Sequence, residues 1–115
     1  MSTSSAPIII KADRIVDGRG HVIQGGSVVV ADGKISRVNT TASAAATYDL
    51  KGYTLLPGLI DAHSHLTWYF NRQGRYHTRG DGDTPVESML STAGNAYATL
   101  MAGFTTIQSP GSPED

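Results

Sequence analysis

Residues 55–65 read Leu-Leu-Pro-Gly-Leu-Ile-Asp-Ala-His-Ser-His. The Pro-Gly pair predicts a turn, and the apolar run after it is typical of a buried parallel strand. His63 and His65 stand two residues apart at the carboxyl end of this strand, so their side chains are expected on one side of it. Imidazoles at this spacing can both reach one metal ion at roughly 2.0–2.1 Å. Asp61 lies two residues before His63, so its side chain is expected on the same side of the strand, where it would support the histidines through a hydrogen bond.

A helix and a second strand are predicted downstream. Thr84, Pro85 and Glu87 are typical of a helix start: an N-cap, a first residue and the partner in a capping box. Gly103 predicts the helix end. Residues 104–108 then predict a second buried strand, which completes a right-handed parallel βαβ unit. The apolar residues of the helix recur at helical spacing and are expected in a core: Val86, Met89, Leu90, Ala93, Ala96, Tyr97, Leu100 and Met101.

The first 56 residues have a different pattern, with short β-branched runs separated by glycine-containing turns. Asp32-Gly33 predicts a type I′ turn that joins residues 27–31 to residues 34–38 as a hairpin. Gly25-Gly26 predicts another turn. The chain is therefore expected to divide into residues 1–56, part of a small β-domain, and residues 57–115, the βαβ unit. The candidate strands of the first part are residues 8–10, 22–23, 28–30, 35–38 and 48–50.

Composition excludes several classes of protein. The formal net charge is -1, and the charges are spread along the chain, so neither a nucleic-acid footprint nor a membrane-binding patch is expected. The absence of cysteine excludes disulfides and thiolate metal sites. No apolar run reaches membrane-spanning length, and no signal segment is evident. We expect a cytoplasmic protein, although a cleaved leader would leave no trace.

The loop after the first strand carries candidate substrate residues. Trp68, Tyr69 and Arg72 crowd this segment, and an arginine there could bind a carboxylate. The alternative is that the aromatic side chains pack under the loop and the arginines are solvated. Gln108, at the end of the second strand, is a candidate pocket residue or a strand cap. His77 is not expected to bind metal, because no strand presents it beside the histidine pair.

Two segments resemble the amidohydrolase superfamily. Residues 56–66 resemble its Pro-Gly-Leu-Ile-Asp-x-His-x-His opening, and residues 100–106 resemble the segment that enters its second barrel strand. Details of residues 68–70 and 103–109 look closest to imidazolonepropionase-like and prolidase-like members. The resemblance implies an α/β fold: a (β/α)₈ TIM barrel, of which this chain holds only the first βαβ unit, plus a small N-terminal β-sandwich domain.

The resemblance also implies a function. His63 and His65 would bind a divalent metal, most often zinc, at one or two ions per complete site. A metal-activated hydroxide would cleave an amide, peptide or cyclic amide C–N bond of a small amide or dipeptide-like substrate. The family's remaining ligands and general base have no counterpart in this sequence. The chain alone is therefore expected to be inactive, with the rest of the barrel supplied as a separate chain or a missing segment, in a homo-oligomer.

Two alternatives remain at this stage. Related barrels that share the His-x-His motif deaminate nucleobase-like rings. The chain could also be a non-catalytic fragment that folds only against a partner chain.

Overall fold

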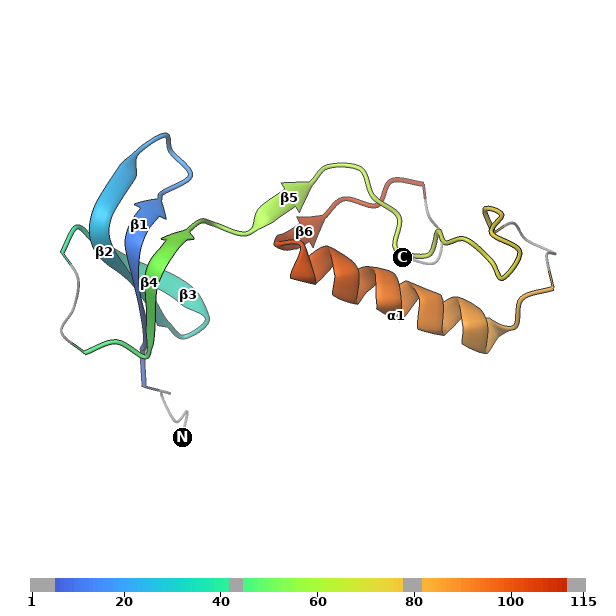
Figure 1. Ribbon diagram of the computed structural model, residues 1–115, viewed down its shortest axis with the longest axis horizontal. Coiled ribbons are helices and arrows are strands. Elements are labelled where there is room, and N and C mark those ends of the chain that lie inside the picture. The colour runs from blue at the N-terminus through green and yellow to red at the C-terminus, as the bar shows by residue number, and fades with distance from the viewer. Residues whose placement is uncertain (1–5, 42–44, 78–81, 112–115) are drawn as a thin grey trace. The chain divides into compact units, whose positions relative to one another are not determined.

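The computed structural model describes residues 6–41, 45–77 and 82–111. They belong to two compact units, Met1–Pro57 and Gly58–Asp115, and each unit is described by itself. Figure 1 shows the strands of the first unit in blue to green and the helix of the second in orange. No helix in this described part is long and apolar enough to cross a membrane.

The first unit contains a four-stranded mixed sheet with the strand order β3-β2-β1-β4. β1 pairs antiparallel with β2, and β2 pairs antiparallel with β3. β4 lies along the other edge of β1 and runs parallel to it. The strands are β1 (Ile8–Val16), β2 (Val22–Ala31), β3 (Lys34–Asn39) and β4 (Tyr48–Leu55).

The β2–β3 hairpin turns at Asp32-Gly33, as predicted. The φ angle is +51° at Asp32 and +72° at Gly33. Both central residues of a type I′ turn require such positive values, which Asp and Gly tolerate better than most residues. This turn is therefore a local property of the sequence.

The Gly25-Gly26 pair lies inside β2, so the turn predicted there is wrong. Pairing with β1 continues through it in one register, with Ala12 opposite Gly26 and Arg14 opposite Gln24. A Cβ atom on Gly26 would lie 2.5 Å from the backbone oxygen of Asn39. Glycine is needed here because two backbones approach closely, a role that the sequence pattern does not distinguish from a turn.

The core of the first unit is small. Ala12, Ile15 and Val28 are buried at its centre. Ser27 is fully buried beside them, and its hydroxyl oxygen accepts a hydrogen bond of 3.2 Å from the Asn39 side-chain amide. This bond satisfies the buried polar atom. A β-sandwich needs a second sheet, and residues 6–41 and 45–57 form only this one.

The second unit is the predicted parallel βαβ unit. β5 (Leu59–Asp61) and β6 (Phe104–Ile107) pair in parallel, and α1 (Pro85–Met101) connects them. The backbone N–H of Glu87 donates to the Thr84 hydroxyl, and the Glu87 carboxylate accepts from the Thr84 backbone N–H. This is the predicted capping box. The chain leaves the helix through Gly103, which has φ +94°.

The apolar face of α1 is exposed, so the core position expected for its residues is wrong within this chain. Met89, Tyr97 and Met101 are 72%, 67% and 67% exposed, and no residue of α1 is buried. Ile60 on β5 is equally open. The physical reason is that a two-stranded parallel sheet offers too little surface to cover a helix and both of its own faces. The further strands of a barrel do not occur among the described residues.

Candidate metal-binding site

His63 and His65 lie just beyond β5 rather than within it. The strand was predicted to reach His63, but its regular pairing ends at Asp61. Two hydrogen bonds hold the next residues against the end of β6. Gln108 N donates to the Asp61 carbonyl oxygen at 2.8 Å, and Ser64 N donates to the Gln108 carbonyl oxygen at 3.0 Å. The histidine segment is therefore tied to both strands of the unit.

The two imidazole rings lie together. Their centroids are 5.2 Å apart and their planes are at 76°. Two imidazoles bound to one tetrahedral zinc at about 2.0–2.1 Å have centroids about 5 Å apart. The pair therefore fits a shared ion in donor type and in spacing. No group of three or more His, Asp or Glu that could hold a metal occurs in the part of the chain that the structure describes.

Asp61 is held next to the first histidine. Its Oδ1 accepts a hydrogen bond of 3.1 Å from the backbone N–H of His63. The Asp61 side chain thus restrains the main chain that carries the imidazole. Asp61 is half-buried, at the end of β5.

Trp68 stacks on the second histidine. The ring centroids of Trp68 and His65 are 3.9 Å apart and the planes differ by 19°. The edge of Tyr76 lies against the indole, with centroids 5.5 Å apart at 80°. Ser109 Oγ lies 3.4 Å from His65 Nδ1. Trp68 was predicted as a pocket residue, and 53% of its surface is exposed.

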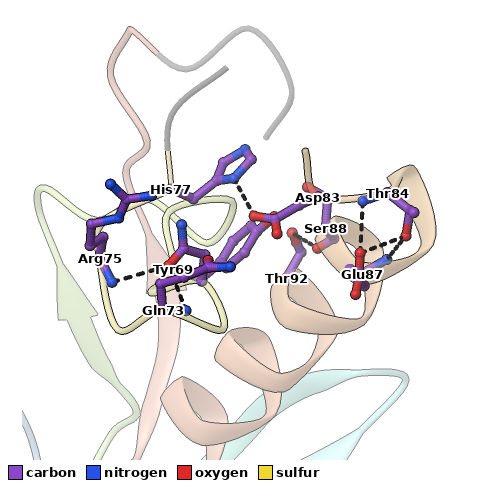
Figure 2. Close-up of polar contacts among 10 residues, drawn as sticks. Tyr69, Gln73, Arg75, His77, Asp83, Thr84, Glu87, Ser88 and Thr92 are labelled. Carbon is purple, nitrogen blue, oxygen red and sulfur yellow. Dashed lines mark hydrogen bonds and ion pairs between the residues drawn. The ribbon is translucent and has the colours of Figure 1, made fainter. Parts of the chain in front are cut away.

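Tyr69 lies in the interior of the loop. It is 8% exposed, and its ring stacks on His77 at 4.6 Å and 13°. The Tyr69 hydroxyl donates to Asp83 Oδ2 at 3.3 Å, and His77 Nδ1 lies 2.8 Å from the same oxygen. Figure 2 shows the two rings converging on Asp83 just before α1. The cluster ties the loop to the start of the helix, an arrangement that sequence reasoning missed because its partners are far apart in the chain.

Arg72 and Gln108 are the other two predicted pocket residues. Arg72 forms an ion pair of 2.5 Å with Glu87, although its side chain is mostly exposed. Hydrogen bonds from the Thr84 backbone and hydroxyl, together with the charge of Arg72, lower the pKa of Glu87. Gln108 takes part in the site through its backbone and is exposed. The structure thus places Arg72 at the start of α1, paired with Glu87, and Gln108 just after β6.

A groove of about 720 Å³ runs beside α1. Its walls include both residues of the His77–Asp83 pair and apolar residues of the exposed helix face. His63 and His65 do not line it. The groove is lined by Thr67, His77, Asp83, Thr84, Pro85, Ser88, Met89, Thr92, Ala93 and Ala96.

Comparison with models of known protein families yields no match. Individual proteins do match. The chain is 34% identical over 92 residues to an imidazolonepropionase of Geobacillus sp. (strain WCH70), covering 71% of this chain and 22% of that protein. It is 31% identical over 103 residues to an imidazolonepropionase of Micrococcus luteus, covering 87% of this chain and 23% of the relative.

Solved structures share the fold. A Xaa-Pro dipeptidase with methionine bound in its active site superimposes with a TM-score of 0.74 at 24% identity, over 93% of this chain and 27% of that one. The ochratoxinase of A. niger superimposes with a TM-score of 0.67 at 21% identity, over 94% of this chain and 26% of that one.

The chain belongs to the amidohydrolase superfamily. Within it, the chain is a distant homologue of the imidazolonepropionases and shares its fold with a Xaa-Pro dipeptidase. It spans about a fifth of the length of those imidazolonepropionases and about a quarter of the matched structures.

Proposed function

We propose that His63 and His65 supply two metal ligands to a metal-dependent hydrolase that cleaves an amide, peptide or cyclic amide C–N bond. The observation that carries the proposal is the 5.2 Å separation of the two rings at the end of a parallel strand. Active sites of parallel α/β folds lie at this end of the strands. The fold shared with a Xaa-Pro dipeptidase supports a small dipeptide-like amide as the substrate class.

The chemistry of the donors suits zinc or another divalent metal of similar preference. Such an ion, when bound, supplies a Lewis acid and a nucleophile at neutral pH. The chain's own residues hold the donors in place. Asp61 restrains the His63 backbone, and the bonds between residues 61–64 and Gln108 hold the segment on β6.

The proposal includes further polypeptide that completes a (β/α)₈ barrel, in the same chain or in a separate one. Two imidazoles leave coordination positions for other ligands, and a hydrolase also needs a general base. The exposed apolar faces of α1 and β5 support this part of the proposal, because such surface in a folded protein is normally covered. The chain spans 22% of the Geobacillus imidazolonepropionase and 27% of the Xaa-Pro dipeptidase, which also supports further polypeptide in the complete enzyme.

Metal analysis of the purified protein tests the ligand role. We expect about one to two zinc or similar ions per complete site. His63→Ala should lower the bound metal and abolish hydrolysis of amide or dipeptide substrates, whereas His21→Ala should change neither. His21 is the matched control because it is an exposed histidine of the first unit, paired with Asp17. Full metal content in His63→Ala would contradict the proposal.

A further inference from the structure

We propose that Trp68 is a positioning residue for His65 and that Asn95 of α1 holds Trp68 in place. The inference rests on the proposed function, since it concerns the orientation of a metal ligand. It assigns to Trp68 a role distinct from lining a substrate pocket. Three residues from three segments are involved: the ligand after β5, the indole in the loop, and an amide on the helix.

The stack itself is the first observation. At 3.9 Å and 19°, the indole covers one face of the His65 ring. The Trp68 backbone N–H donates to the His65 carbonyl oxygen at 3.3 Å, so main chain and side chain of the two residues are both in contact. Tyr76 supports the indole with its ring edge. Rotation of the His65 ring would therefore break an aromatic contact.

Asn95 provides the second observation. Its side-chain amide nitrogen donates to the Leu66 carbonyl oxygen at 2.8 Å and to the Trp68 carbonyl oxygen at 2.9 Å. Asparagine is a weak helix former, and here it lies in the middle of α1. Both of its amide hydrogens are used on the loop backbone. Through Asn95, the helix thus holds the backbone carbonyls of Leu66 and Trp68, and with them the segment that carries the indole.

The physical consequence is preorganisation of the ligand. A metal-binding imidazole that rotates freely must lose that freedom when the ion binds, and a ring already held in place loses less. The stack restrains the tilt of the His65 ring, and the contact of Ser109 Oγ with Nδ1 restrains its rotation. Residues that orient metal ligands in this way typically contribute about 10- to 100-fold to metal affinity.

The test measures zinc affinity of the purified protein by chelator competition. Trp68→Ala should weaken zinc binding by about 10- to 100-fold. Asn95→Ala should weaken it in the same direction, and Trp68→Phe, which keeps a stacking ring, should restore most of the affinity. Phe70→Ala is the matched control, since Phe70 is an exposed aromatic residue of the same loop, and it should leave the affinity unchanged. Thermal unfolding of each variant reports whether it is folded.

A second readout is the quenching of tryptophan fluorescence by Co²⁺. Trp68 is the only tryptophan of the chain. We expect Co²⁺ to quench its fluorescence in the wild type and to quench it less at the same Co²⁺ concentration in Asn95→Ala, because the indole lies against His65 only while the loop is held in place. Unchanged affinity in Trp68→Ala or, if that variant does not fold, in Asn95→Ala would overturn the positioning role. If His63→Ala still abolished binding in that experiment, the proposed function would stand. A wild-type protein that binds no zinc would instead refute the proposed function.

Discussion

The carboxylate of Asp61 accepts a hydrogen bond from the backbone N–H of His63, two residues along the chain, at 3.1 Å. A side chain at the last position of β5 thus sets the direction in which the main chain leaves the strand. The position of the His63 imidazole therefore depends on the hydrogen bond that Asp61 accepts at the end of β5.

Replacing Asp61 should therefore impair metal binding without removing a ligand. Asp61→Ala is expected to lower zinc affinity about 10-fold, as loss of an outer partner of a ligand does. Asp61→Asn keeps an acceptor oxygen and should lose less. Chelator competition measures both variants, and equal, wild-type affinity in the two would argue against the coupling.

Gly58 is expected to be intolerant of any side chain. A Cβ atom there would collide with the side chain of Thr105 on the paired strand, which would separate β5 from β6. Gly58→Ala should therefore lower the melting temperature and reduce metal binding. Gly94→Ala is the control, because a Cβ there meets nothing within 4 Å, and alanine in a helix interior should stabilise by about 0.5–1 kcal/mol. Destabilisation of equal size in both variants would contradict this account.

Removal of the helix cap should weaken the start of α1. Thr84→Ala deletes the hydroxyl that accepts from Glu87 N, and we expect a loss of about 1 kcal/mol in the free energy of unfolding. Thr84→Ser keeps the acceptor and should lose little. Denaturant unfolding of the three proteins measures the difference, which should be absent if the cap is unimportant to the fold.

Acid should weaken the turn between β1 and β2. The hydrogen bond from the His21 side chain, followed by that from Arg19 N, lowers the pKa of Asp17 from 3.8 to about 2. A depressed carboxyl pKa means that the ionised group stabilises the folded state above pH 3.8 and that this contribution is lost as the pH falls toward 2. NMR titration of Asp17 should show the low pKa in the wild type and a higher one in His21→Ala. His77→Ala, in the other unit, should leave the Asp17 titration unchanged.

The parts of the fold that sequence predicted correctly are those governed by neighbouring residues. The helix start at Thr84 follows from a bond to a residue three positions away, and the Asp32-Gly33 turn follows from the φ values of two adjacent residues. The parallel pairing of β5 with β6 follows from one helix between two apolar runs. The His63–His65 pair could be found in the same way, because spacing of two residues is visible in any strand-like segment.

The surroundings of the pair depended on contacts between distant residues. Tyr69, a predicted pocket residue, instead packs on His77 and bonds to Asp83 fourteen positions away, and Asn95 reaches the Trp68 carbonyl across twenty-seven positions. Sequence periodicity predicts on which face of a strand or helix a side chain lies, but it does not predict which distant residue that side chain contacts. The two imidazoles could therefore be identified from the linear sequence. The contact of Trp68 with His65, and the hydrogen bond from Asn95 to the Trp68 carbonyl, form only when strand, loop and helix pack together.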